Sequence, residues 1–300
     1  MDFDTFLDQA WTDHATDSPS VATRLNGQAL ALVSDEGQVL RLGHLAHHVL
    51  GEHLARWQDG LQFVQQLAAL LPLGTEHDPA VAPALRRFQA SLRLAGGLAD
   101  ERAAFTPSDR IRITALAAAN LGCHDAARAN ALLNDALIQA DAAALPDKDP
   151  AHRALAIAGN GIAGTLEEKP GRNPDDTALM LRAAQVARQF WARAGTWLET
   201  ERAEYRLAMS WCQAGDLAQA RRHAQNCLEI VSANGNVPLE VFFGWEALGT
   251  AERSAGNVTG HQHALAQAQA AFATLDKDDQ TWCRASLDKL QGSLPATAAP

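Results

Sequence analysis

The stretch LAQARRHAQNCLEIV, residues 217–231, decides the fold class of this chain. Its apolar side chains recur every three or four residues, and charged or amide side chains fill the positions between them. This period places the apolar residues on one face of an α-helix and the polar residues on the other. The residues of the apolar face are Leu217, Ala220, Ala224, Cys227, Leu228 and Val231.

Capping signals show where other helices begin. A side-chain oxygen before a proline caps the free N–H groups of the first turn, and proline loses no hydrogen bond at that position. Such pairs occur at Ser18-Pro19, Asp78-Pro79, Thr106-Pro107, Asp149-Pro150 and Asn173-Pro174, and Pro238 is expected to open a helix in the same way. With the apolar spacing, these signals predict helices at 2–15, 19–33, 36–50, 53–71, 79–95, 107–121, 124–143, 150–166, 175–194, 199–214, 217–233, 238–255, 258–275 and 278–291, with residues 97–105 left ambiguous.

The composition favours the same fold class. Ala and Leu dominate the 47% of hydrophobic residues, whereas aromatic residues make up only 6%. Ala and Leu favour helices, while strands favour β-branched and aromatic residues. No segment alternates with a period of two, so we expect no β-sheet. Connections of two to six residues predict antiparallel helical hairpins.

Charge and cysteine spacing exclude several classes of protein. With 25 Lys+Arg against 35 Asp+Glu, the net charge of −10 disfavours binding to nucleic acid. The sequence has no run of about 18 apolar residues, so we expect no membrane span. The N-terminal residues Met1-Asp2-Phe3-Asp4 are acidic, whereas an export signal begins with basic residues. The four cysteines form no CxxC pair and predict neither a disulfide framework nor a zinc site. We therefore expect a cytoplasmic protein without membrane or nucleic-acid partners.

An internal repeat lies near the C-terminus, where Trp245, Leu248 and Gly249 precede a turn at Gly256-Asn257. The matching positions 41 residues earlier are Glu204, Leu207, Ala208 and Trp211, then the turn Gly215-Asp216, followed by Ala220, Ala224 and Cys227. This pattern resembles the tetratricopeptide repeat, with weaker copies starting at Ile111 and at Leu42-Gly43. The spacing exceeds the usual ~34 residues of that family. In addition, His261 stands where a small residue is expected, and the closing proline is missing.

The resemblance implies an all-α, right-handed solenoid of stacked antiparallel helix hairpins with a C-terminal capping helix. In domain terms, it implies hairpins at 1–78 that belong to the same array, a repeat array at 79–275 and a capping helix at 276–292. The low-complexity segment 293–300 is predicted to be a disordered tail. A generic stack of α-hairpins is the alternative and predicts nearly the same architecture.

Function, by the same resemblance, is recognition of a peptide or partner protein in the concave groove, without catalysis or cofactor. An Arg/Tyr-lined patch suits an acidic segment or a C-terminal carboxylate. The implied groove residues are Arg202, Tyr205, Met209, Gln213, Glu246, Thr250 and Arg253, joined by His44, His47 and His48 if Leu42-Gly43 starts a repeat. A ligand- or peptide-sensing regulatory domain that acts through another protein is the alternative function.

A glycine motif offers a competing, enzymatic interpretation. Gly159, Gly161 and Gly164 match the G-x-G-x-x-G pattern of dinucleotide-binding folds. However, the preceding segment is rich in Ala and Leu and follows a helix cap at Asp149, so it predicts a helix where that fold needs a strand. We therefore expect glycines that allow close helix packing. No nucleophile elbow or phosphate-binding loop is present in the sequence.

Two further groups of residues are candidate ligand-binding sites. The first is the cluster of His44, His47 and His48, with Glu52 and His53 beyond it. His44 and His48 are four residues apart and could chelate a metal from one helical face, but the spacing places no third ligand, and we predict no metal site. The tryptophans could form an aromatic cage, yet helical spacing favours inter-helix packing for Trp211 and Trp245. The five tryptophans concerned are Trp191, Trp197, Trp211, Trp245 and Trp282.

Overall fold

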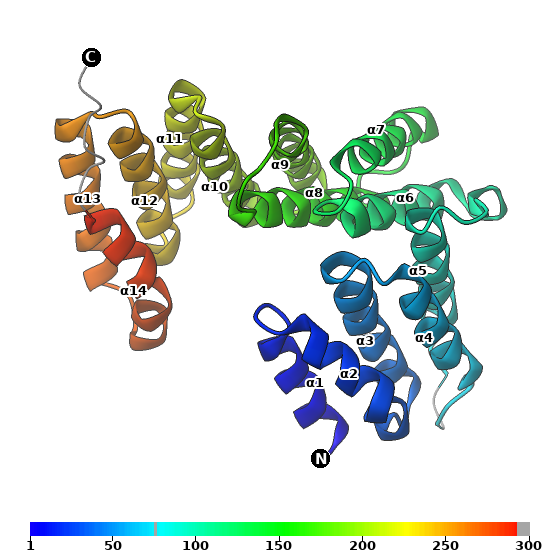
Figure 1. Ribbon diagram of the computed structural model, residues 1–300. Helices are drawn as coiled ribbons and strands as arrows, with labels where there is room; N and C mark the ends of the chain where they lie inside the picture. The colour runs from blue at the N-terminus through cyan, green and yellow to red at the C-terminus, as the bar shows by residue number, and fades with distance from the viewer. Residues whose placement is uncertain (75–76, 293–300) are drawn as a thin grey trace. The chain divides into compact units, whose positions relative to one another are not determined.

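The computed structural model describes residues 1–74 and 77–292, and these ranges contain fourteen α-helices and no β-strand (Figure 1). The predicted all-α class is confirmed. The α-helices are α1 (Phe3–Asp13), α2 (Ser18–Gln28), α3 (Glu36–Ala46), α4 (Trp57–Ala69), α5 (Val81–Ala95), α6 (Pro107–Leu121), α7 (Ala126–Ala143), α8 (Pro150–Glu168), α9 (Pro174–Ala194), α10 (Trp197–Ala214), α11 (Leu217–Ala233), α12 (Pro238–Ser254), α13 (Val258–Ala273) and α14 (Lys277–Gln291). None of the described helices has the length and apolarity needed to cross a bilayer. The predicted tail, 293–300, lies outside the described residues.

Each of the fourteen predicted helices overlaps an observed one, and the largest departure lies between residues 46 and 57. The helix predicted at 36–50 stops being α-helical at Ala46 and continues as a π-helix, η2 (His47–His53). The next helix therefore begins at Trp57, four residues later than predicted. Two short 3-10 helices complete the list, η1 (Ala29–Leu32) and η3 (Arg102–Ala104), the second inside the segment left ambiguous.

Most of the predicted caps are confirmed. Thr106 and Asn173 each accept a backbone hydrogen bond from the third residue of the helix that they precede, and Asn173 forms a reciprocal capping box with Asp176. Two assignments are wrong. Ser18 lies inside α2, which Asp17 caps instead. Asp78 binds a backbone N–H in a turn, and α5 begins only at Val81.

The chain divides into two compact units, Met1–Ala158 and Gly159–Pro300, with the boundary inside α8. In the first unit, α1 to α5 and η2 surround one apolar core. Phe6, Leu25 and Leu42 enter this core from helices before residue 78, and Leu85 and Phe88 enter it from α5. The helices on both sides of residue 78 thus share a core. The same unit contains α6 and α7, which pack against each other.

In the second unit, each helix packs against the next one along the chain, and α10 also contacts α12, which in turn contacts α14 (Figure 1). Small residues occupy the close contact between α10, α11 and α12, namely Ala208, Ala224 and Ala247. Larger side chains fill the end of the unit, where Phe242 of α12 packs with Phe272 and Leu287.

The glycine motif lies inside α8, so its backbone N–H groups belong to a helix and are not displayed in a loop. A Cβ atom at Gly159 would lie 2.5 Å from the carbonyl oxygen of Ala183 and 2.8 Å from the backbone nitrogen of Ala187, both in α9. A Cβ at Gly161 would meet nothing within 4 Å. The prediction of a helix with a glycine at a close helix contact is therefore confirmed for Gly159.

Candidate functional site

The groove residues predicted in the second unit lie on α10 and α12, and two pairs of side chains bond across the contact between these helices. The hydroxyl of Tyr205 donates to Oε2 of Glu246 at 3.0 Å. Nη2 of Arg202 donates to Oε1 of Glu240 at 2.6 Å. Tyr205 and Glu246 are 41 residues apart, the spacing of the predicted repeat, and their hydrogen bond joins α10 to α12.

Hydrogen bonds also connect α10 to α8 and α12 to α14. Oε2 of Glu167 in α8 accepts from Nη1 of Arg206 at 2.5 Å, and its Oε1 accepts from the hydroxyl of Ser210, also at 2.5 Å. At the other end, Nη1 of Arg253 in α12 donates to the backbone carbonyls of Lys289 and Leu290 in α14. Polar bonds thus join α8, α10, α12 and α14, four helices that alternate along the chain.

The accessibility of these residues differs. Arg202 and Gln213 are exposed, and Gln213 accepts a hydrogen bond from Nη2 of Arg172 at 2.8 Å. Tyr205, Met209, Thr250 and Arg253 are half-buried. Glu246 is only 5% exposed, and burial raises its pKa to about 7 against the hydrogen bond from Tyr205. Its carboxyl group therefore belongs to the helix contact and is not displayed for a partner.

Three aromatic rings, one each from α10, α12 and α14, form a row. The ring of Phe243 in α12 lies 5.5 Å from that of Tyr205 in α10 and 5.3 Å from that of Trp282 in α14, edge to face in both cases. Trp282 is 65% exposed. In the sequence, Trp282 is one of five tryptophans and Phe243 carries no signal of its own, because the helical period alone does not show which rings meet across helices. Trp245, by contrast, is half-buried against His263, 5.5 Å away.

The predicted histidines lie in the first unit and have different environments. His47 is buried, with its Nε2 2.8 Å from the hydroxyl of Ser91 and 3.3 Å from Nδ2 of Asn120. Burial lowers the pKa of His47 to about 4, so it is neutral at pH 7. His44 is exposed and has its ring edge to face with Phe88, 4.8 Å away. Neither residue joins the cluster formed by His48.

His48 instead meets two histidines that the sequence analysis did not select, His14 and His53. Nε2 of His48 lies 3.0 Å from Nε2 of His53. One ring nitrogen from each of the three residues lies within 4.8 Å of the other two. All three are half-buried, and the indole of Trp11 lies beside the cluster, 5.5 Å from the ring of His48. We refer to these three histidines as the histidine trio.

The π-helix explains why spacing did not reveal the trio. His48 and His53 are five residues apart, and in an α-helix such residues lie on different faces. A π-helix has a hydrogen bond that spans five residues, and Leu54 N–H donates to Val49 in this way at 3.1 Å. The indole of Trp57 forms a hydrogen bond with the last turn of this π-helix, where its Nε1–H donates to the carbonyl of Gly51 at 3.2 Å. His14, from the α1–α2 connection, is brought in by tertiary packing alone.

Protonation in the trio is governed by burial and by Glu52. Burial lowers the pKa of His48, but the hydrogen bond from its Nδ1 to Glu52 (2.9 Å) and the charge of that carboxylate outweigh burial and raise it. Burial and the charges of His48 and His14 lower the pKa of His53 to about 4. His53 therefore carries a free nitrogen electron pair at pH 7.

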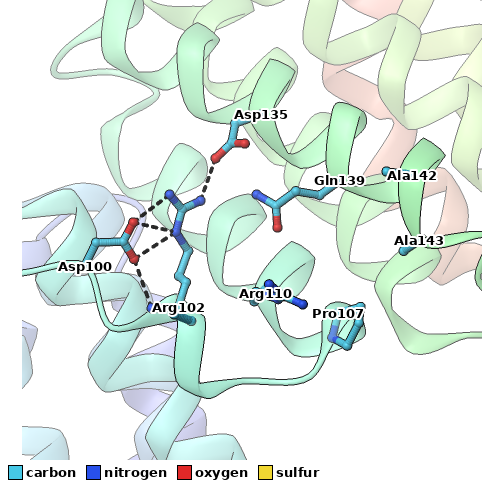
Figure 2. Close-up of a pocket in the computed structure, with 9 residues that line it drawn as sticks. Asp100, Arg102, Pro107, Arg110, Asp135, Gln139, Ala142 and Ala143 are labelled. Carbon is cyan, nitrogen blue, oxygen red and sulfur yellow. Dashed lines mark hydrogen bonds and ion pairs between the residues drawn. The ribbon is translucent and has the colours of Figure 1, made fainter.

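A surface cavity of about 570 Å³ lies in the first unit between η3, α6 and α7 (Figure 2). Arg102 enters it, but its guanidinium group is already bonded to Asp100 (2.8 Å) and to Asp135 (2.6 Å). A second cavity, of about 590 Å³, lies at the end of α11 beside Val241 and Trp245. Since two carboxylates neutralise Arg102, the first cavity is not an anion-binding site built on that residue.

Comparisons with protein-family models, with curated proteins and with solved structures found no match to this chain.

Proposed function

We propose that the second unit is a tetratricopeptide-like array of helical hairpins and that the face formed by its alternate helices binds a peptide segment of a partner protein, without catalysis. The unit contains the helices from α9 to α14 and part of α8. The proposal rests on the same residues as the repeat resemblance, and it is supported by the hydrogen bond between Tyr205 and Glu246, which stand 41 residues apart as in that repeat. A stack of this kind offers an extended surface for a partner.

The aromatic row of Tyr205, Phe243 and Trp282 is the observation that carries the proposal. A tryptophan that is 65% exposed leaves a large apolar surface in water, and tryptophan and tyrosine are enriched among the residues that dominate binding energy at interfaces. In a repeat array, the last helix normally turns a polar surface outward. Trp282 departs from this rule on α14, and it does so next to Phe243. The proposed ligand is therefore a peptide with aromatic or large apolar side chains.

An acidic peptide or C-terminal carboxylate, the partner first expected, has less support. Arg202 uses its Nε and Nη2 donors on Glu240, and Tyr205 uses its hydroxyl on Glu246. A carboxylate ligand would have to displace one of these carboxylates or bind to the three N–H groups that remain on Nη1 and Nη2 of Arg202. The net charge of −10 also repels an acidic segment at long range. Apolar recognition on the aromatic row avoids both difficulties.

The proposal also places the protein in a reducing compartment such as the cytoplasm. It is supported by the four cysteines, none of which forms a disulfide. Disulfides are the usual device of chains that fold in oxidising compartments.

Selection of peptides from a random library on the purified chain tests the proposal. We expect the selected peptides to be rich in aromatic and large aliphatic residues. Trp282→Ala should weaken their binding by at least about tenfold, because truncation removes the most exposed ring of the row. Titration of a labelled selected peptide, followed by fluorescence anisotropy, measures the effect.

Val258→Ala is the matched control. Val258 is 47% exposed on α13, in the same unit but outside the aromatic row. Its variant should bind the peptide as the wild type does, and circular dichroism should show equal helix content in both variants. Equal binding by wild type and Trp282→Ala would exclude the aromatic row as the binding surface. A library that yields no binder would argue against peptide recognition by this unit.

A further inference from the structure

We propose that the histidine trio, His14, His48 and His53, is a binding site for a divalent transition-metal ion of the zinc class, with three imidazole ligands and one open coordination position. The site lies in the first unit, whereas the proposed peptide-binding face lies in the second. Either proposal can therefore fail without the other.

The convergence of the ring nitrogens is the first argument. A tetrahedral Zn²⁺ ion with Zn–N bonds of about 2.05 Å holds two ligand nitrogens about 3.3 Å apart. Nε2 of His48 and Nε2 of His53 are 3.0 Å apart, and the third nitrogen, from His14, lies within 4.8 Å of both. Small side-chain movements bring this set to the tetrahedral spacing. The rings also crowd together, with centroids 4.6 to 5.2 Å apart.

The outer hydrogen bonds are the second argument, because they leave the correct nitrogen available. Nδ1 of His14 lies 2.6 Å from the carbonyl oxygen of Trp11. A carbonyl only accepts, so this Nδ1 carries the hydrogen and Nε2 keeps its electron pair. Nδ1 of His48 donates in the same way to the carboxylate of Glu52 at 2.9 Å. Histidine ligands of zinc commonly have such a carboxylate or carbonyl partner, which orients the ring and increases its basicity.

The ligand set selects the class of ion. Three imidazoles suit zinc and its neighbours among the divalent transition metals, whereas Mg²⁺ and Ca²⁺ prefer oxygen ligands. The carboxylate of Glu52 is already engaged with His48, and it also lies 3.9 Å from Nδ1 of the buried His47. We therefore assign Glu52 to the positioning of His48 and leave the fourth position of the ion to water or to an external ligand.

Without an ion, a proton shared between His48 and His53 would also explain their close approach. The two explanations differ in their dependence on His14, which contributes no atom to that shared proton. They also differ from simple chelation by His44 and His48, the pair suggested by helical spacing. Variants at these positions therefore separate a three-histidine site from both alternatives.

The test is a titration of the metal-stripped full chain with Zn²⁺ in competition with a chromophoric chelator of micromolar affinity. We expect one Zn²⁺ per chain. His14→Ala, His48→Ala and His53→Ala should each weaken binding by about 100-fold or more, and Glu52→Gln by about tenfold, in line with the effect of outer-shell partners. With Co²⁺ as the probe, the wild type should show the intense visible absorption of a tetrahedral site, and His14→Ala should lose it.

His44→Ala is the matched control, because His44 lies one turn from His48 but faces Phe88. It should bind Zn²⁺ as the wild type does, and circular dichroism should confirm that every variant is folded. His14→Ala is the decisive variant, since its ring is half-buried in a connection between helices and its loss leaves the core intact. Unchanged Zn²⁺ affinity in His14→Ala, an equal loss in His44→Ala, or no saturable binding by the wild type would overturn the proposal.

Discussion

Replacing Gly159 with alanine is expected to destabilise the protein by about 3 kcal/mol, near the upper end of what overpacking costs. The added Cβ would lie 2.5 Å from one backbone atom of α9 and 2.8 Å from another. Such contacts cannot be relieved by rotating a side chain, because both atoms belong to a helix backbone. α8 and α9 would have to move apart. Urea unfolding followed by helix ellipticity measures the loss.

Gly161→Ala is the matched control and should change stability in the opposite direction. Gly161 is exposed in the same helix, and its added Cβ would meet nothing within 4 Å. Since alanine is favoured over glycine in a helix interior, we expect a gain of about 0.5–1 kcal/mol. If the motif bound a dinucleotide, both glycines would be needed for binding. Equal destabilisation by the two substitutions would contradict the packing role assigned to Gly159.

The helices could be predicted well because their signals are local. The cap at Asn173 and the apolar period of residues 217–231 act within one or two turns, and both are realised in the structure. The errors at Ser18 and Asp78 are also local. Near Ser18, the preceding Asp17 caps the helix instead. Asp78 accepts a hydrogen bond from the N–H of Ala80 within a turn, and the helix begins after that turn. Capping chemistry therefore fixes the presence of a helix more firmly than its first residue.

The candidate sites were harder to predict, because they depend on contacts between distant residues. The repeat alignment placed Tyr205 and Glu246 at equivalent positions, but it did not show that the two side chains bond to each other and remove Glu246 from the surface. The histidine trio needed both a π-helix and the packing of His14, which is 34 residues before His48 in the sequence. Neither follows from a helical period of 3.6.

Buried acids are a further property of the second unit that composition did not reveal. Glu201 and Glu204 are neighbours on α10, and both are buried. Glu204 is satisfied by Arg188 (2.5 Å), His223 (2.6 Å) and Asn226 (3.1 Å). Burial alone would raise the pKa of Glu204, but these hydrogen bonds outweigh it and lower the pKa below its usual value.

Glu201 has no such partners. No N–H group donates to its two buried oxygens, and its carboxyl group lies against that of Glu240, with which it can share a proton. Burial, and then the charge of Glu240, raise the pKa of Glu201 to about 8. One helix thus contains a stabilised carboxylate, Glu204, and a carboxyl group that stays protonated at neutral pH, Glu201, three residues apart.

Glu201→Gln is therefore expected to stabilise the protein, and to do so more at alkaline than at acidic pH. In the folded protein Glu201 keeps its proton up to about pH 8, whereas in the unfolded chain it loses it near pH 4.5. The folded state thus binds more protons between these values, and stability falls as the pH rises through this window. A neutral amide removes this loss and can donate to Glu240. Since each pKa unit corresponds to about 1.4 kcal/mol, we expect a gain of several kcal/mol at pH 8.5 and little change at pH 4.5.

Urea unfolding at pH 4.5, 6.5 and 8.5 measures this dependence, and Glu204→Gln is the matched control. The Glu204 carboxylate accepts hydrogen bonds from Arg188 and His223, so the uncharged amide weakens both. The control should therefore lose stability at pH 6.5 and 8.5, the opposite of Glu201→Gln. The acid Glu246, with its pKa raised to about 7, remains in all three proteins and cancels in the comparison. A difference between wild type and Glu201→Gln that stays constant with pH would show that Glu201 is not protonated in the folded protein, and its unpaired oxygens would then require another explanation.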